Sequence, residues 1–248
     1  MILRRITQHV RDQNWTAVAI DFAIVVVGVF VGLQASNWNA DRVDQRREAT
    51  FRAGLARDVQ SDVAEIDAVL HVATVRMSAL AWLIESATGE PLPDGFDSAR
   101  GRIAIEPVPP YDPADARTVG ISAFILTTLD GTRLTYDTIV STEGIGVIGD
   151  AGLVREIQQY YAQVDKARTF EAELRLNWDR LVAEQQRAGL SPVDALPAAA
   201  LAARFRGDPA LVAAAKTYWL FTNRHLKLMG DLRHEAQALL ARLDPDAP

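Results

Sequence analysis

One uncharged apolar stretch limits the fold of this chain more than any other feature. From Phe22 to Ala35 no residue is charged, and most positions are Val, Ile, Phe, Ala or Gly. A helix needs about 20 mostly apolar residues to cross a bilayer. Trp15 and Trp38 flank the stretch, where aromatic residues gather at membrane–water interfaces. The segment 15–38 therefore predicts a retained transmembrane helix with Trp15 and Trp38 as its interfacial anchors.

Two other interpretations of this stretch are open from the sequence. The first is a cleaved signal peptide, because Arg4 and Arg5 supply a basic front. Against it, the apolar part is longer than usual, and residues 34–39 are a poor small-residue cleavage site. The second is a buried helix in the core of a soluble protein. We expect the retained anchor.

Small residues gather on one side of the predicted transmembrane helix. Gly28 and Gly32 form a G-x-x-x-G pattern, and Ala35 follows. Asp21 precedes Gly28 by seven residues, which places it within about 20° of the same face. A carboxylate at that depth is unfavourable unless it reaches the interface or a partner. We expect this face to pack against another transmembrane helix, although Asp21 as the plain end of the hydrocarbon zone is the alternative.

After the span the apolar residues recur every three or four positions, as in a helix that packs in a bundle or coiled coil. This heptad seam predicts a helical stalk over residues 39–88. Its members are Val59, Val63, Ile66, Leu70, Ala73, Met77, Leu80 and Ile84. Five prolines then exclude helix from a loop over residues 89–112. Within this loop at most residues 102–106 form a short strand.

The rest of the chain predicts further helices. Asp112 and Pro113 form a helix start, and that helix is expected to reach Leu129. Further helices are predicted over residues 134–141, 150–189, 197–205 and 209–243. We therefore predict an all-α fold, a single N-terminal transmembrane helix continuing into a stalk and an extramembrane helical bundle. Its parts are a basic tail (1–14), the transmembrane helix (15–38), the stalk (39–88), a Pro-rich loop (89–112) and the bundle (113–248), which packs on the stalk.

Composition removes most catalytic and metal-binding chemistries. Without Cys there is no disulfide, thiolate metal site or Cys nucleophile, and four His leave little room for zinc or iron. His225 and His234 are nine residues apart, so they lie on opposite sides of one helix and cannot share a metal. A net charge of −6 argues against nucleic acid as a partner. We predict no cofactor, no metal and no enzymatic activity.

Other residue groups have ordinary structural interpretations. The run Gly144–Gly149 matches a dinucleotide-binding fingerprint but lacks the surrounding βαβ unit, so we predict a turn. Acidic pairs are interpreted as solvated helix faces, namely Asp58 with Asp62 and Glu171 with Glu173. Aromatic residues at helical spacing predict core rather than a ligand cavity, namely Tyr160, Tyr161, Trp178, Tyr218, Trp219 and Phe221.

The span also carries a distinctive residue pattern. It consists of Asp21, Val25-Val26-Val27-Gly28 and Leu33-Gln34-x-x-Asn37-Trp38-Asn39. A looser set follows, namely Tyr136, Ser141, Gly144, Leu153 and Tyr160-Tyr161. These residues resemble a bacterial family of uncharacterised single-pass membrane proteins. Asp21 replaces the more usual Glu, Ser36 stands in place of the first Asn, and Ala40 occupies a position where an acid is common. The resemblance implies membrane anchoring and a helical extramembrane domain, and it implies no known activity.

These features predict the location and role of the protein. We expect a single-pass protein of the bacterial inner membrane, with the lipid bilayer and other transmembrane proteins or further copies of this chain as partners. The short basic N-terminal tail favours a main domain in the periplasm, whereas five Arg between residues 42 and 57 favour the cytoplasm. The expected role is a non-enzymatic interaction or accessory (scaffolding) protein. The alternative is a sensory domain that binds a small ligand and signals through a partner.

Overall fold

The structure, a computed structural model of the full chain, describes residues 15–99, 101–114, 119–142, 144–191 and 194–244, with side chains from residue 18 on. These residues are mainly helical, which confirms the all-α fold class. The elements are α2 (Trp15–Thr88), β1 (Gly95–Ser98), β2 (Gly101–Ala104), α3 (Val119–Phe124), α4 (Leu134–Ser141), the 3₁₀ helix η1 (Gly144–Val147), α5 (Ala151–Arg187), α6 (Ala198–Arg206) and α7 (Pro209–Leu243). The chain divides into two compact units, residues 1–51 and 52–248.

Helix starts follow the capping residues in the sequence. Asp150 accepts hydrogen bonds from the amides of Gly152 and Leu153 at the start of α5. Asp208 caps α7 in the same way, with Pro209 in the first turn. These bonds pair amides that have no partner inside the helix. They also lower the pKa of both carboxyl groups.

Two predictions in the connecting region are wrong in their bounds. The helix expected from Asp112 to Leu129 is found, among the described residues, only over α3, and residues 125–133 are not helical. Part of that expected helix, residues 115–118, lies outside the described residues. The short strand lies at Gly101–Ala104 rather than 102–106, and it pairs antiparallel with β1. Sequence pattern alone did not indicate β1, because four residues with a glycine carry little periodicity.

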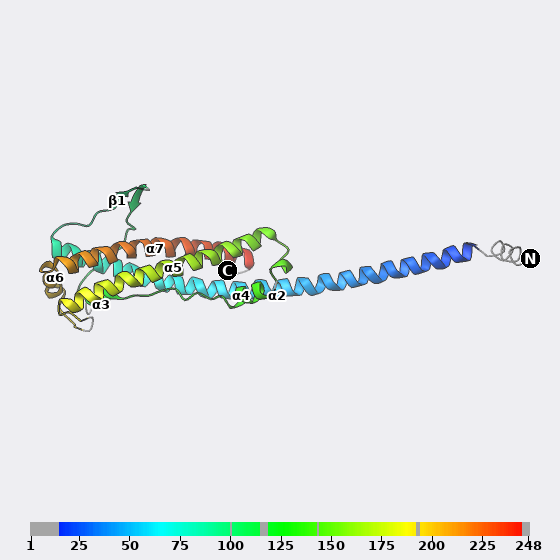
Figure 1. The fold of residues 1–248 in the computed structure, drawn as a ribbon, viewed down its shortest axis with the longest axis horizontal. Helices are drawn as coiled ribbons and strands as arrows, with labels where there is room; N and C mark the ends of the chain where they lie inside the picture. The colour runs from blue at the N-terminus through cyan, green and yellow to red at the C-terminus, as the bar shows by residue number, and fades with distance from the viewer. Residues whose placement is uncertain (1–14, 100, 115–118, 143, 192–193, 245–248) are drawn as a thin grey trace, which may run out of the picture. The chain divides into compact units, whose positions relative to one another are not determined.

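In the unit of residues 52–248, α2, α5 and α7 run side by side (Figure 1). Asp208 at the start of α7 bonds Arg187 at the end of α5, and Asp150 at the start of α5 bonds Arg242 near the end of α7, so these two helices are antiparallel. The apolar seam of α2 is buried in this unit. Val59, Ile66, Ala73, Met77, Leu80 and Ile84 are at most 1% exposed, and Val63 and Leu70 are half-buried.

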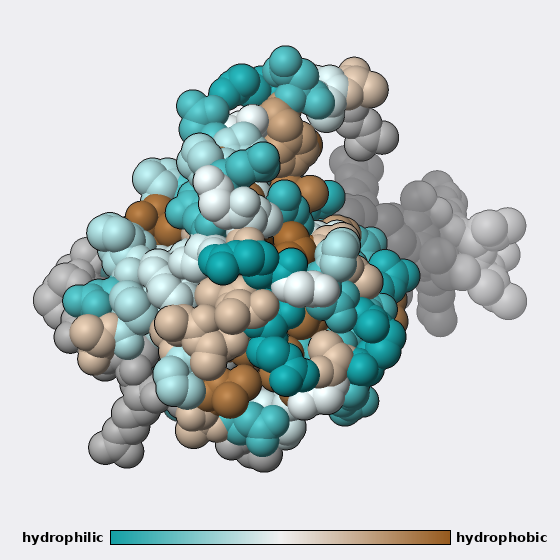
Figure 2. Space-filling model, turned by 90° about the vertical axis from the view of Figure 1, so that its left-hand side faces the viewer, coloured by the Kyte–Doolittle hydropathy of each residue, from teal (hydrophilic) through white to brown (hydrophobic). Residues whose placement is uncertain are grey.

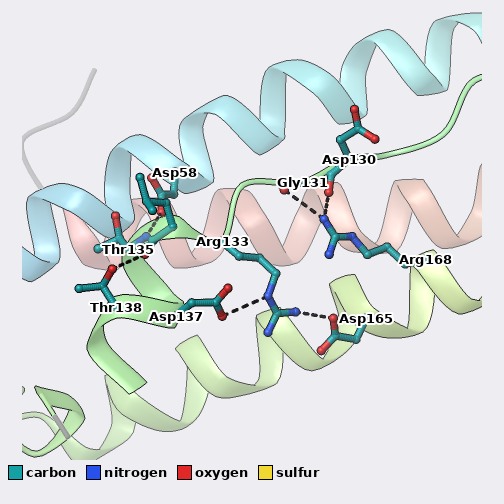
Figure 3. A network of polar contacts seen from close by, with 10 residues as sticks. Asp58, Asp130, Gly131, Arg133, Thr135, Asp137, Thr138, Asp165 and Arg168 are labelled. Atoms are coloured by element: carbon teal, nitrogen blue, oxygen red, sulfur yellow. Dashed lines mark hydrogen bonds and ion pairs between the residues drawn. The ribbon is translucent and has the colours of Figure 1, made fainter. Parts of the chain in front are cut away.

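The chain returns from the far end of α2 through residues 125–133, which we call the return segment. It runs antiparallel to α2, because Ile125 contacts Arg76 whereas Thr132 contacts Asp62. Residues 62–76 of α2 cover about 21 Å at 1.5 Å per residue. Seven residue steps of extended chain cover about 23 Å. The return segment is therefore extended and lies between α2 and α5 (Figure 3).

After the return segment α4 packs closely on α2, and this contact depends on a glycine. A Cβ at Gly54 would lie 2.7 Å from Cγ2 and 3.0 Å from Oγ1 of Thr135. Replacing Gly54 by Leu should thus destabilise the protein by about 1–3 kcal/mol through overpacking. Gly230→Leu on α7 is the matched control, because a Cβ there meets nothing within 4 Å. We expect this control to stabilise by up to about 1 kcal/mol through higher helix propensity.

The measurement is the free energy of unfolding of the full chain in a mild detergent. Equal changes in the two variants would contradict the close packing of α4 on α2.

Candidate functional site

The unit of residues 1–51 presents the predicted span as an exposed helix. One window of α2 has a mean hydropathy of 2.3 and no buried residue, and it is long and apolar enough to cross a membrane. Large apolar side chains are exposed along it, among them Phe22 at 70% and Phe30 at 63%. By length and composition, α2 is the one such helix among the described residues.

The predicted packing face of the span is present on this helix without a neighbour. Asp21 and Ala35 are exposed. A Cβ built at Gly28 or Gly32 meets nothing within 4 Å. Their role in packing against another helix stays a prediction. The side chain of Trp15, the first predicted interfacial anchor, lies outside the described residues.

Trp38, the second predicted anchor, has a partner that the sequence analysis missed. It is 58% exposed, and the guanidinium carbon of Arg42 lies 3.8 Å from the centroid of its ring. The spacing of four residues was a usable signal, because side chains at i and i+4 are neighbours on a helix. The exposed indole and the cation stacked on it form one surface feature.

In the other unit, three carboxylates of α2 hold the return segment and the start of α4. Glu65 accepts the amide of Asp130 at 2.6 Å and that of Gly131 at 3.1 Å. Asp62 accepts the amide of Thr132 at 2.6 Å. Asp58 accepts the amide of Thr135 at 2.9 Å, so it caps the first turn of α4 from a neighbouring helix.

These acidic residues are spaced four and three apart, which places them on one face of α2. The prediction that Asp58 and Asp62 form a solvated face is wrong for Asp62, which is fully buried. Burial raises the pKa of Asp62, against the hydrogen bonds from Thr132 and from the hydroxyl of Tyr160 at 2.7 Å. Figure 3 shows the opposite side of the segment, where Arg168 of α5 donates to the carbonyls of Asp130 and Gly131.

A second group of polar side chains lies deeper in the bundle and joins all three long helices. Arg76 of α2 donates from Nη2 to Nδ1 of His225 at 3.1 Å. His225 of α7 is bonded through Nε2 to Oε1 of Glu171 on α5 at 2.8 Å. Arg76 and His225 are fully buried, and Glu171 is 4% exposed. We call these three residues the buried relay.

The return segment meets both ends of the buried relay. The Glu171 carboxylate accepts the amide of Leu129 at 3.0 Å and 3.1 Å. Arg76 Nη1 donates to the carbonyl of Ile125 at 3.1 Å, and the hydroxyl of Tyr218 reaches the same oxygen at 3.4 Å. The prediction that Glu171 belongs to a solvated face is therefore wrong. The relay and the carboxylates of α2 both bond the extended backbone of the return segment, in which Leu129 is buried and the other residues are partly or fully exposed.

Arginine chemistry determines the protonation of His225. A guanidinium has only donors, so Nδ1 of His225 must accept and Nε2 must carry the hydrogen that Glu171 receives. His225 is thus neutral, with a cation on one side and a carboxylate on the other. Burial lowers the pKa of His225, with Arg76 acting in the same direction, whereas the hydrogen bond to Glu171 opposes them. Burial likewise lowers the pKa of Arg76.

A sequence signal for the relay existed at Arg76. It precedes Met77 of the apolar seam and lies three residues after Ala73 and four before Leu80, so a helical wheel places it at the buried face. A charge in that position needs an opposite charge nearby. Its partners come from residues 95 and 149 positions away, so local pattern does not identify them.

The arrangement holds the return segment and the three long helices together. Each relay residue is committed to the others or to the return segment, and within the described residues no group of His, Cys, Asp and Glu could hold a metal ion. His225 is buried and His234 exposed, in agreement with their opposite phases. The aromatic set is core, as predicted, since Tyr160, Tyr161, Tyr218 and Trp219 are at most 5% exposed and Trp178 and Phe221 half-buried.

Removing Glu171 should destabilise the protein strongly. In Glu171→Ala the cation of Arg76 stays buried without the carboxylate that His225 connects to it, and the Leu129 amide loses its acceptor. Breaking one partner of a buried charge pair lowers the free energy of unfolding by about 3–5 kcal/mol. Glu173→Ala is the matched control, because Glu173 is exposed two positions along the same helix. Exposed substitutions of this kind change stability by about 0.5 kcal/mol or less. Comparable losses in the two variants, measured by denaturant unfolding, would refute the structural role of the relay.

The protein should also become less stable as the pH drops below neutral, because His225 is buried in its neutral form. Its folded-state pKa lies below the ordinary 6.5, so the unfolded chain binds a proton that the folded chain refuses. The free energy of unfolding therefore falls once the pH drops below about 6.5, by up to about 1.4 kcal/mol per pH unit, until the folded-state pKa is reached. We expect His225→Asn to lose this slope in unfolding measured between pH 7.5 and 5, and the exposed-site variant His234→Gln to keep it. Asp62 titrates in the opposite sense but equally in all three proteins. A wild-type slope in His225→Asn would exclude His225 as the titrating group.

Comparison of the chain with protein-family models, with curated proteins and with solved structures found no match. The resemblance to a bacterial single-pass membrane family stays a prediction from the span residues, and a function has to be argued from the geometry alone.

Proposed function

We propose that the protein is a membrane-anchored, non-enzymatic interaction or accessory protein, in which the apolar part of α2 crosses a bilayer and the helical bundle binds other proteins. The observation that carries the proposal is the fully exposed apolar window of α2, whose mean hydropathy is 2.3.

The exposed apolar side chains of this window lie on every side of the helix. Val25, Val26 and Val27 are 62%, 39% and 60% exposed, and successive residues point about 100° apart around a helix axis. A partner helix in water would cover one stripe of such a surface, whereas lipid covers all of it. A helix that is apolar on every side and unburied is typical of a membrane span.

The bundle has a different surface. On the face seen in Figure 2, hydrophilic residues surround small, separate hydrophobic patches, as on ordinary water-exposed proteins. Its buried charged groups bond the return segment and each other. These buried groups hold structure, so they do not provide the reactive side chains facing a substrate that an active site needs.

Location and partners are part of the proposal. We place the protein in the bacterial inner membrane with one crossing and, on the basis of the short basic tail, with the bundle in the periplasm. We infer that the face of Asp21, Gly28, Gly32 and Ala35 contacts another transmembrane helix, of a second copy or of a larger complex. Its support is the close approach that small residues allow in lipid.

Membrane extraction tests the proposal. The full chain expressed in bacteria should stay in the membrane pellet after an alkaline carbonate wash, and after cross-linking it should migrate as an oligomer or with a partner. Val25→Arg/Val29→Arg should move it out of the pellet, because each Arg at the centre of a span opposes insertion by about 2.5–3.5 kcal/mol. The matched control, Gln45→Arg/Ala49→Arg, adds the same charge at exposed positions of α2 beyond the apolar window and should stay in the pellet. Release of the wild-type chain by carbonate would overturn the membrane anchor, and a wild-type monomer after cross-linking would overturn the partner.

A further inference from the structure

We propose that Trp38 and Arg42 together form a binding site for the phosphate group of a membrane phospholipid. This inference rests on the proposed function, since it requires the apolar part of α2 to lie in a bilayer. It adds a ligand of stated chemistry and a residue, Arg42, that the sequence did not single out.

The pair lies where the apolar surface of α2 ends. The last large apolar residue of the uncharged run is Leu33, 57% exposed, and Trp38 follows within about one and a half turns. Indole rings favour the interface between hydrocarbon and water, because they combine an apolar body with one N–H donor. This position puts Trp38 at the depth of the lipid headgroups.

The geometry of the stack leaves Arg42 free to bind an anion. Its guanidinium lies over the face of the indole, 3.8 Å from the centroid. The five N–H groups of a guanidinium point outward in its plane, so stacking engages the face and leaves the donors at the edge. Within the described part of the chain, Arg42 has no hydrogen bond or ion pair to a carboxylate.

Neighbouring arginines differ from Arg42 in this respect. Arg47 lies 4.0 Å from Asp44 and is partly neutralised by it. Arg46, one turn beyond Arg42, is exposed, and among the described residues no aromatic ring lies beneath it. Arg42 is thus the arginine of this stretch that is both oriented by a ring and left with free donors. Phosphate fits such a fork, because guanidinium binds two of its oxygens at once.

The test uses the full chain purified in detergent and native mass spectrometry of retained lipid. Three lipids with identical acyl chains are added in turn: phosphatidylglycerol and phosphatidylcholine, which carry a phosphodiester, and diacylglycerol, which does not. We expect the two phospholipids to be retained and diacylglycerol to be retained weakly. Arg42→Gln should reduce phospholipid retention roughly tenfold, as expected for the loss of a charge-assisted bidentate contact.

Matched variants separate a built site from diffuse charge. Arg46→Gln removes the same charge one turn away and should change retention by less than about threefold, because a screened surface charge contributes little. Arg42→Lys should fall between wild type and Arg42→Gln, since lysine keeps the charge without the fork. Trp38→Leu should lower retention although all charges remain. The three positions, Trp38, Arg42 and Arg46, are exposed in the structure, so folding is not at stake.

The failure of this inference is distinguishable from the failure of the proposed function. Equal losses in Arg42→Gln and Arg46→Gln, or retention of diacylglycerol equal to that of phosphatidylglycerol, would overturn the phosphate site. Both variants should remain in the carbonate-washed membrane pellet, because neither changes the apolar window. If the wild-type chain itself leaves that pellet, the membrane anchor is wrong and the phosphate site with it.

Discussion

The bundle depends on one constraint, which is that an extended backbone packed against helices must find hydrogen-bond partners wherever it is shielded from water. The return segment is neither helix nor sheet, and it shares backbone hydrogen bonds with the neighbouring helices only at its ends, from the amide of Ile125 to the carbonyl of Ile121 and from the amide of Asp137 to the carbonyl of Arg133 among the described residues. Side chains supply the bonds instead. Acids of α2 and α5 accept its amides, and arginines of both helices donate to its carbonyls. The polar groups of the interior therefore follow from the path of the chain.

This view explains why charge is buried at all. Taking Arg76 and Glu171 out of water is unfavourable by several kcal/mol each, and their attraction alone compensates for this poorly. The backbone amide of the buried Leu129 would be left without an acceptor if Glu171 were absent. Each charged group bonds a backbone group of the return segment, although Nε of Arg76 is itself buried without a hydrogen-bond partner among the described residues. Neutral His225 connects the two charges, so α2, α5 and α7 meet in one register with the return segment.

The sequence predicted the features that arise from local pattern. The capped starts of α5 and α7, the bounds of α4 and the buried seam of α2 all agree with the structure, because each depends on residues within a few positions. The return segment was predicted as helix up to Leu129, since nothing local excludes helix there. Glu171 and Asp62 were interpreted as solvated because their partners lie 42 and 70 positions away or more. Their burial is a property of the tertiary path and has no local signature. The same holds for Trp38, whose aromatic character was noted but whose cation was found only in the structure.

The same constraint also explains why the two units of the chain differ in where they carry charged residues. The hydrocarbon of a bilayer offers the backbone no hydrogen-bond partner. The proposed span therefore has to be a helix, whose amides and carbonyls pair internally. The span can then be apolar on every side, as its exposed residues are. In the bundle the chain can leave the helix, provided that neighbouring helices carry acids and arginines at the right turns. Charged residues are accordingly missing from Phe22–Ala35, whereas α2 carries Asp62, Glu65 and Arg76 on the face that touches the return segment. A substitution that adds a charge to the proposed span, or removes one from the side chains that bond the return segment, should be unfavourable for the same reason. Each leaves a polar group unpaired away from water.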